Sequence, residues 1–330
     1  MKSLLFASTL AVMLPSLGAA DGSDPKPWTH QNFDADPGKF TFAIHADLTG
    51  GERPGIFATA MAQLNLLRPD FVISVGDLIE GGEIQRDQFE AEWEAYDNRV
   101  RSFPGPIFYV GGNHDLSTDL SREVWAERYG PTYYHFRYKN VLFLVLDTED
   151  TSPADRVEIA KARAKAIMIY QSDGPEAFAQ TEYANLAHRT AGTIGDDQRN
   201  YFLEAIEHNT DVRWTFLFLH KPAWQHRVKT PFASIEAALS ERPYTVFNGH
   251  VQAYGHEVRN GRDYVQLATT GGEQFPDLGL SEDHVTLVTM TNTGPNIANL
   301  MLSGIRDKTG AIPRDGGDLC FSVERCGDDQ

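Results

Sequence analysis

Five short polar segments hold most of the residues of this sequence that could do chemistry, and each follows an apolar run. They are Asp47-Leu48-Thr49, Gly76-Asp77-Leu78-Ile79-Glu80, Gly112-Asn113-His114-Asp115, His220-Lys221-Pro222 and Gly249-His250-Val251-Gln252. Carboxylate and amide oxygens combined with imidazole nitrogens form a ligand set that suits Mn, Fe, Zn and similar divalent ions. One such segment alone would be an ordinary turn. Five of them in order predict a metal centre.

The apolar runs before these segments predict β-strands that would bring the polar residues together. We expect strands at residues 40–44, 71–75, 107–110, 214–219 and 244–247, further strands at 133–138, 141–146, 264–268 and 284–291, and helices at 54–67, 87–99 and 198–207. The strand–helix–strand order of residues 40–75 predicts a parallel pair with a right-handed crossover. Ligands of open α/β sheets lie at the carboxyl ends of the strands, so the five segments are expected to converge there.

The pair Asp47 and Asp77 adds a second argument for metal. Two neighbouring carboxylates repel each other unless one is protonated or a cation lies between them. Two divalent ions about 3.5–4 Å apart can clamp an in-line displacement at phosphorus. His45 shares the strand face of Asp47 and is an alternative ligand, although a packed or hydrogen-bonded histidine is the more common role of such a residue.

In order and in form, the five segments resemble the motifs of the calcineurin-like metallophosphoesterases over roughly residues 40–270. That family carries Asp-x-His, Gly-Asp-x-x-(Asp/Glu), Gly-Asn-His-(Asp/Glu), a lone His and Gly-His-x-His. The resemblance implies an α/β fold, a four-layer sandwich of two mixed β-sheets flanked by helices. It also implies a metal-dependent phosphoric ester hydrolase with two divalent ions (Mn, Fe, Zn or Mg), in which a metal-bound hydroxide attacks phosphorus.

The resemblance also assigns roles to single residues. Asp77 would bridge two ions, and Asn113, His220 and His250 would complete one metal site. His114 matches the family's catalytic histidine, which contacts the substrate phosphate or protonates the leaving oxygen. Glu80 stands where the family places the carboxylate that pairs with that histidine.

Two departures from the family pattern fall on the other metal site, to which Asp47 belongs. Thr49 replaces the His of Asp-x-His, and Gln252 replaces the final His. This site would keep Asp47, the shared Asp77 and the Gln252 amide oxygen, and we expect it to bind metal more weakly and to prefer hard ions such as Mn, Mg or Fe. The main alternative function is therefore a metal-binding module of the same fold with reduced or no turnover. A further alternative is a secreted domain that uses one metal for stability.

The composition limits the classes of partner that this protein could bind. The chain of 330 residues carries 29 Lys and Arg against 46 Asp and Glu, a formal net charge of −17 at pH 7. Such a surface repels nucleic acid and anionic lipid, so we expect neither as a partner. A small phosphorylated substrate remains compatible with this charge if a metal supplies local positive charge. The oligomeric state cannot be predicted from these features.

The domain organisation follows from local composition. Residues 1–20 have the features of a signal peptide, with Lys2, an apolar stretch and the small residues Gly18-Ala19-Ala20. We expect a periplasmic or secreted protein with a polar linker over 21–38, a phosphoesterase domain over 39–303 and a C-terminal tail over 304–330. Export favours a disulfide between Cys320 and Cys326 over two free thiols.

A helical insertion is expected at residues 149–195, where the strand pattern is interrupted. Apolar residues, among them Val157 and Met168, share one face of the predicted helix, and basic residues, among them Arg163 and Lys165, share the other. We expect this segment to pack over the sheet or to act as a lid.

Overall fold

We describe the protein from a computed structural model, which describes residues 27, 29, 33–82, 84–226 and 230–327. The chain divides into two units, residues 1–37 and 38–330, and the fold below is that of the second. The predicted signal peptide lies outside the described residues. Within the described part of the chain, no helix is long and apolar enough to cross a membrane.

The first sheet has five strands in the order β11-β10-β1-β2-β3. Its strands are β1 (Phe40–His45), β2 (Phe71–Ser74), β3 (Ile107–Phe108), β10 (His284–Thr291) and β11 (Gly294–Met301). The strands β1, β2 and β3 run parallel, and β10 pairs antiparallel with β1. The helix α1 (Ile56–Leu67) connects β1 to β2, so the predicted parallel pair is confirmed.

The second sheet has six strands in the order β4-β5-β6-β7-β9-β8. Its strands are β4 (Tyr134–Tyr138), β5 (Val141–Val145), β6 (Trp214–Phe218), β7 (Tyr244–Asn248), β8 (Gly255–Arg259) and β9 (Arg262–Gln266). The strands β5, β6, β7 and β9 are parallel, and the two edge strands β4 and β8 are antiparallel to their neighbours. The central strands β5, β6 and β7 are buried along nearly their whole length, which explains why these segments read as continuous apolar runs.

Phenylalanines fill the space between the two sheets. Phe42 of β1 stacks on Phe71 of β2 with ring centroids 5.2 Å apart. Phe143 of β5 meets the edges of both rings, at 5.5 and 5.3 Å. Burying each of these rings contributes roughly 1.5–3 kcal/mol, so this layer holds the two sheets face to face.

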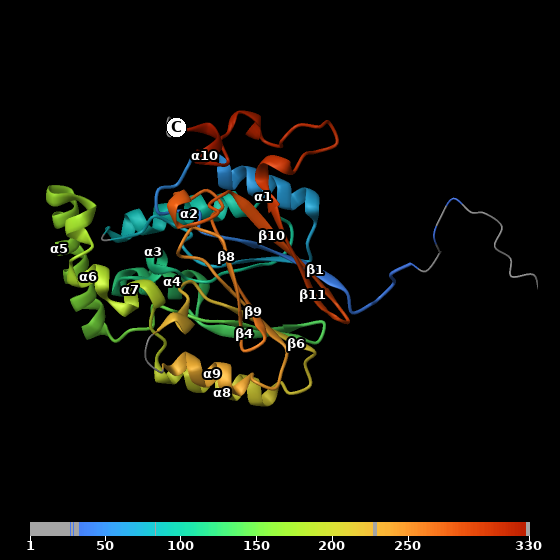
Figure 1. Cartoon of the computed structure of the whole chain (residues 1–330), viewed down its shortest axis with the longest axis horizontal. Helices are drawn as coiled ribbons and strands as arrows, with labels where there is room; N and C mark the ends of the chain where they lie inside the picture. The colour runs from blue at the N-terminus through green and yellow to red at the C-terminus, as the bar shows by residue number, and fades with distance from the viewer. Residues whose placement is uncertain (1–26, 28, 30–32, 83, 227–229, 328–330) are drawn as a thin grey trace, which may run out of the picture. The chain divides into compact units, whose positions relative to one another are not determined.

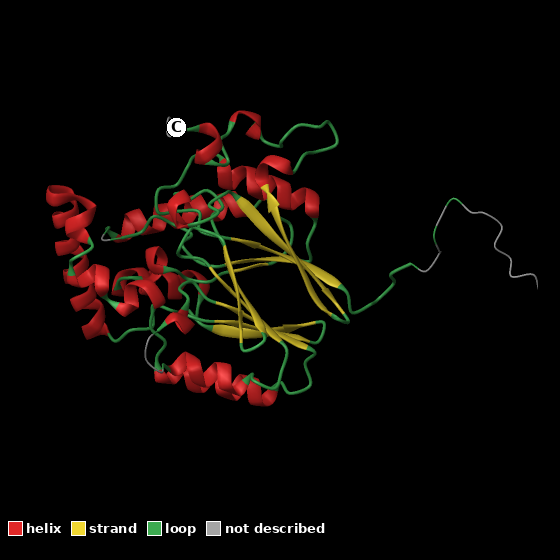
Figure 2. Cartoon of the chain, viewed as in Figure 1, coloured by secondary structure: helices red, strands yellow, loops and turns green. Residues whose placement is uncertain are grey.

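Helices cover the outer faces of both sheets, as Figures 1 and 2 show. The first sheet is covered by α1, α2 (Arg86–Val100) and α4 (Asp119–Tyr129), which share its outer core. The second is covered by α8 (Asp196–His208) and α9 (Pro231–Ala238). The predicted sandwich of two mixed sheets flanked by helices is confirmed. The elements β8, β11, α4 and α9 were not predicted, because their apolar patterns are short or half-exposed.

The segment between β5 and α8 is helical. It forms α5 (Pro153–Phe178), α6 (Glu182–Asn185) and α7 (Ala187–Ala191), which lie together at one side of the sandwich in Figure 1. Only Ala166 of α5 is fully buried. Val157 and Met168 stay 48 % and 62 % exposed. The apolar face that the sequence predicted is therefore not packed on the sheet along its length.

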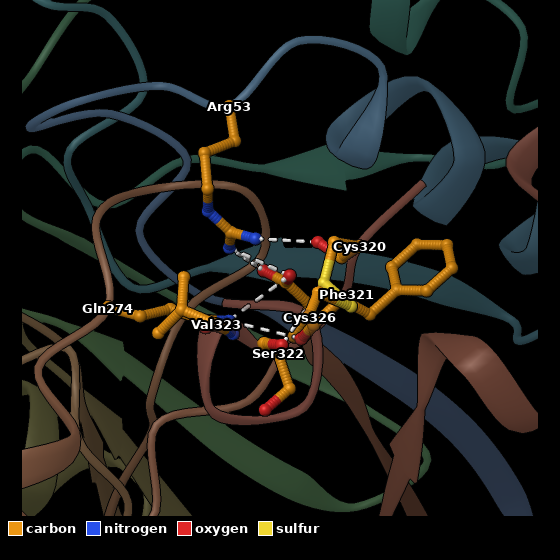
Figure 3. The surroundings of a disulfide bond; sticks show 8 residues. Arg53, Gln274, Cys320, Phe321, Ser322, Val323 and Cys326 are labelled. Carbon is orange, nitrogen blue, oxygen red and sulfur yellow. Dashed lines mark hydrogen bonds and ion pairs between the residues drawn. A yellow bond between two sulfur atoms is a disulfide. The ribbon is translucent and has the colours of Figure 1, made fainter. Parts of the chain in front are cut away.

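The C-terminal residues return to the loop that follows β1. Cys320 and Cys326 form a disulfide, as predicted. Arg53 donates to the Cys320 carbonyl at 3.0 Å, as Figure 3 shows. It also forms a two-oxygen ion pair with the buried Asp283 at 2.7 Å. Between residues 305 and 327, the described part of the tail, the regular structure consists of η4 (Gly316–Asp318) and α10 (Val323–Cys326).

Candidate metal centre

The carboxyl ends of β1, β2, β3, β6 and β7 deliver the five polar segments to one place. Asp77 follows β2, His220 follows β6 and His250 follows β7. One ligand atom from each of these three residues lies within 4.8 Å of the other two. Residues separated by up to 173 positions thus meet because the strands that carry them are parallel neighbours or face each other across the sandwich.

Asp77 is at the middle of this group. Its carboxylate lies 3.1 Å from His220 Nε2 and accepts the His114 backbone N–H at 2.9 Å. Burial alone would raise the pKa of Asp77, but the charges of His220 and His114 hold it well below its usual value. These charges favour the ionised form of Asp77, which suits a residue assigned to bridge two cations.

His220 is oriented by a contact with the main chain. Its Nδ1 lies 2.9 Å from the Val75 carbonyl oxygen, which can only accept a hydrogen bond. This leaves Nε2 toward Asp77 and toward Asn113 Oδ1, which lies 3.2 Å away. A histidine whose second nitrogen donates to a carbonyl is the usual arrangement of a metal ligand. Burial lowers the pKa of His220, but the neighbouring carboxylates outweigh it and raise that pKa to about 9.

The surroundings of His250 lower its pKa, whereas those of His220 raise the pKa of His220. Its Nε2 lies 2.8 Å from the Arg189 carbonyl of α7, and its backbone N–H donates to the Asp47 carboxylate. Burial together with the charges of His220 and Lys221 lowers its pKa well below the usual value. A neutral imidazole is the form that binds metal, and Nδ1 has no hydrogen-bond partner among the described residues.

Asp47 and Gln252 supply the oxygen atoms of the second candidate metal site. Asp47 is fully buried, and burial raises its pKa to about 7. The Gln252 amide nitrogen donates to the Thr49 carbonyl at 3.2 Å, while its Oε1 is buried without a hydrogen-bond partner among the described residues. A buried oxygen without a partner is costly unless a ligand occupies its free direction, so it fits a metal ligand.

Thr49 and His45 do not contribute ligands in this arrangement. The Thr49 hydroxyl donates to the Ile79 carbonyl at 2.8 Å. His45 is fully buried against Phe57, with its Nδ1 at the Ala46 carbonyl and its Nε2 3.4 Å from the Tyr96 hydroxyl. His45 is therefore a packed histidine, and the site on the Asp47 side has no imidazole among its assigned ligands.

The contact between Glu80 and His114 differs from the one assigned by resemblance. His114 Nδ1 lies 2.6 Å from the backbone carbonyl of Glu80. The Glu80 carboxylate instead accepts the backbone N–H groups of Gly50, Gly51 and Glu52 at 2.9–3.2 Å. Glu80 thus fixes the loop after Asp47 and orients His114 through its main chain, so its assignment as a carboxylate partner of that histidine is corrected.

At two positions glycine is required because a larger residue would not fit, and not because of the backbone conformation. A Cβ on Gly112 would lie 2.2 Å from Asp77 Oδ1, and one on Gly249 would lie 2.3 Å from Asp47 Oδ2. Neither glycine has a positive φ. The sequence analysis gave Asn113 and His250 chemical roles but did not predict that their preceding glycines make room for the carboxylates of other segments.

Two residues near the centre, Asp115 and Lys221, stand in the predicted polar segments but were given no role by the sequence analysis. Asp115 is buried, accepts the N–H groups of Leu78 and Gly112 at 2.9 and 2.8 Å, and shapes the turn around Asp77. Burial and the Asp77 charge raise its pKa to about 7. Lys221 directly follows His220, and this position is the signal that could have given it a role.

A buried ion pair lies behind the centre. Lys221 Nζ and Glu149 Oε1 are 2.7 Å apart, and each side chain is only 3 % exposed. His188 of α7 lies 3.1 Å from the other Glu149 oxygen. Burial would raise the pKa of Glu149, but the Lys221 charge overrides it and lowers that pKa to about 2. The ion pair ties β5 and α7 to the loop that carries His220.

The described donors fit divalent metal ions. Asp77, Asn113, His220 and His250 offer oxygen and nitrogen atoms around one position, and Asp47 and the unpartnered Gln252 oxygen offer further oxygens beside it. A mixed oxygen and nitrogen set of this kind suits Mn, Fe or Zn, and the oxygen-rich part suits Mg or Mn.

Comparisons with known proteins agree with this geometry. The sequence model of the family described as calcineurin-like phosphoesterase matches residues 36–264. This chain belongs to the calcineurin-like phosphoesterase family. It is accordingly a metal-dependent phosphoesterase, and the resemblance on which the sequence analysis relied is confirmed. No curated protein sequence gives a significant match.

Solved structures with low sequence identity share the fold. A dimetal phosphatase from Danio rerio is 14 % identical with a TM-score of 0.54, and the match covers 79 % of this chain and 98 % of that one. A structure titled PhoD is 14 % identical with a TM-score of 0.52, covering 80 % and 68 %. GAP50, described as the anchor in the inner membrane complex of Plasmodium, is 11 % identical with a TM-score of 0.50, covering 83 % and 87 %.

Proposed function

We propose that this protein hydrolyses phosphate ester bonds of a small phosphorylated substrate at the strand-end centre, with two divalent ions held by its residues. The observation that carries the proposal is the convergence of Asp77, His220 and His250 within 4.8 Å. When bound, the ions supply Lewis acidity at the phosphoryl oxygens and a water of lowered pKa. Asp77 would contact both ions, Asn113 with the two histidines would complete one site, and Asp47 with Gln252 would hold the other.

His114 is the residue proposed to act on the substrate. Its Nδ1 faces the Glu80 carbonyl at 2.6 Å, so that nitrogen carries a proton and the free Nε2 is directed elsewhere. A Cβ on Gly50 would lie 3.6 Å from this Nε2 and 2.9 Å from the Gln252 amide nitrogen. His114 Nε2 therefore borders the Gln252 side of the centre. When protonated, it can donate to a phosphate oxygen or to the leaving oxygen.

The second candidate is a metal-binding module with little or no turnover. It is favoured by the departures at Thr49 and Gln252, which leave one site without imidazole. The accessible and oriented His114 favours the enzyme, because a pure binding module has no use for a proton donor beside the metal ligands.

We also propose that the protein works in the periplasm or outside the cell. The signal-peptide features of residues 1–20 support this. The disulfide between Cys320 and Cys326 also supports it, since such bonds persist in oxidising compartments. Fractionation of the native host, with the mature N-terminus determined by mass spectrometry, tests this proposal. Recovery of unprocessed protein from the cytoplasm would contradict it.

The experiment for the main proposal combines metal analysis with turnover. Wild-type protein reconstituted separately with Mn, Fe, Zn and Mg is assayed on phosphate monoesters, diesters and pyrophosphates. Asp77→Asn should lose both metal and activity, because the variant removes the charge assigned to both ions. Asp173→Asn on exposed α5 is the matched control and should keep both. An Asp77→Asn protein with full metal content by elemental analysis would overturn the bridging role, and a metal-loaded wild type inactive on every ester would favour the binding module.

A further inference from the structure

A small cavity lies next to the metal centre, on the side where α5 and α6 approach the core (Figure 1). Its volume is about 40 Å³, and its wall includes Asn113 from the centre, Arg156 and Arg163 from α5, Tyr183 from α6, and Lys221. About 10–15 Å³ of such volume accommodates one water. The cavity therefore has room for a group of a few heavy atoms, such as a carboxylate or a phosphate.

Most of the charges around this cavity are already paired. Lys221 is bound to Glu149 at 2.7 Å. Arg156 is bound to Asp119 of α4 at 2.7 Å, and it also donates to the Thr151 carbonyl. These pairs hold the cavity wall in place but leave little free positive charge on it.

Arg163 differs from Lys221 and Arg156 because its charge has no partner among the described residues. Among the described residues, none forms a hydrogen bond or an ion pair with its guanidinium, although the side chain is half-buried and lines the cavity. The Tyr183 hydroxyl, on the opposing helix, also has no hydrogen-bond partner among the described residues. A protein with a net charge of −17 thus presents an unpaired cation and a free hydroxyl in a cavity that shares Asn113 with its metal centre.

We infer that this cavity is a subsite for a second anionic group of the substrate, with Arg163 as its specificity-determining residue. The preferred substrate class would then be a phosphate ester that also carries a carboxylate or another phosphate. The inference rests on the proposed function for the position of the phosphate being cleaved. A charge-assisted hydrogen bond from a guanidinium is worth enough to change affinity about 10- to 100-fold.

Phosphonates that cannot be hydrolysed test the subsite without relying on turnover. The probes are phenylphosphonate, its 3- and 4-carboxy derivatives, and 1,4-phenylene bisphosphonate, titrated calorimetrically into the metal-loaded protein. The last probe separates a phosphate-selective subsite from a carboxylate-selective one. The variants are Arg163→Gln and, as the matched control, Lys165→Gln, which removes the same charge from an exposed position of α5 outside the cavity wall.

Wild type and Lys165→Gln should bind at least one doubly anionic probe about tenfold more tightly than phenylphosphonate. Arg163→Gln should lose that ratio and keep its affinity for phenylphosphonate, and Arg163→Lys should restore part of the ratio. Equal ratios in wild type and Arg163→Gln, or no preference in wild type, would overturn the inference. A preference that depends on Arg163 in a protein without hydrolytic activity would uphold the subsite and reject the proposed hydrolysis. A protein that binds none of the probes would overturn both.

Discussion

Three residues assigned to the metal centre hold backbone conformations that residues other than glycine rarely adopt. The φ angles are 56° at Asp77, 72° at His250 and 55° at Gln252. Each such conformation costs of order 1–3 kcal/mol and persists only where the surrounding structure imposes it. All three lie two to four residues beyond the end of β2 or β7, so the strands and their loops hold these residues in a geometry that the local sequence would not choose.

The role of His114 makes a prediction at the residue scale. His114→Ala should keep metal content near that of wild type and lower turnover by ~10²–10⁴, the usual loss when a positioned proton donor is removed. Elemental analysis and kcat on an ester with a poor leaving group are the measurements. His208→Ala, at an exposed position of α8, is the control and should leave turnover unchanged. Unchanged turnover in His114→Ala would remove this residue from the mechanism.

The unpartnered Gln252 oxygen makes a second prediction. Gln252→Leu should weaken one of two bound ions at least tenfold and leave the other as in wild type, because the change deletes a ligand from the Asp47 side alone. Metal titration into metal-free protein measures both steps. Gln225→Leu at the surface is the control. Identical titrations of Gln252→Leu and wild type would show that the amide binds no ion.

The contacts of the Thr49 side chain indicate that restoring the family's histidine at this position would destabilise the protein. The Thr49 side chain is fully buried and donates to the Ile79 carbonyl at 2.8 Å. An imidazole at this position would lose that hydrogen bond and overpack its surroundings, which typically costs 1–3 kcal/mol. Gln252→His is therefore the better single change for strengthening the site, and it should shift metal preference toward Zn and Co.

At the scale of the element, α5 and α7 have different relations to the core. The helix α5 buries only Ala166. In contrast, the segment after it forms the Arg189 contact with His250, and Thr193 donates to the Thr148 carbonyl at 2.7 Å. The predicted insertion thus consists of an outer helix and an inner segment that belongs to the support of the metal centre.

Replacing residues 153–180 by a flexible Gly-Ser linker should therefore preserve the fold and change KM more than metal affinity. Removal of 152–192, which also takes His188 and Arg189, should lower the free energy of unfolding, because Glu149 and His250 lose partners. Circular dichroism and urea unfolding compare the two deletions. If the shorter deletion already unfolds the protein, α5 is part of the core despite its exposure.

At the scale of the whole molecule, the C-terminal segment is linked to the loop that follows the first strand. The Arg53 guanidinium joins the carbonyls of Cys320 and Gly272 to the Asp283 carboxylate. Burial raises the pKa of Asp283 to about 7 even against the Arg53 charge. The tail after residue 304 is therefore tied to the loop after β1 around Cys320.

The disulfide should make a measurable contribution to the stability of the domain. Replacing Cys320 and Cys326 by serine should lower the free energy of unfolding by about 2 kcal/mol, the value expected for a short closed loop. Urea unfolding of the variant, and of wild type with and without reductant, measures this. Wild type under reducing conditions should match the variant, and no difference in either comparison would show that the loop is held by its packing alone.

The sequence alone determined the parts of this protein that depend on local pattern. Apolar runs predicted the parallel strands, and the polar residues at their carboxyl ends predicted candidate metal ligands that would meet where those ends converge. The tertiary structure decided which atom of each residue faces which neighbour. In the folded protein, the His45 side chain lies in the core and the Glu80 carboxylate accepts hydrogen bonds from loop N–H groups. The unpaired Arg163 lines the same cavity as Asn113. These contacts join segments about 30 to 50 residues apart, so they depend on sheet order and helix placement, which no local pattern encodes.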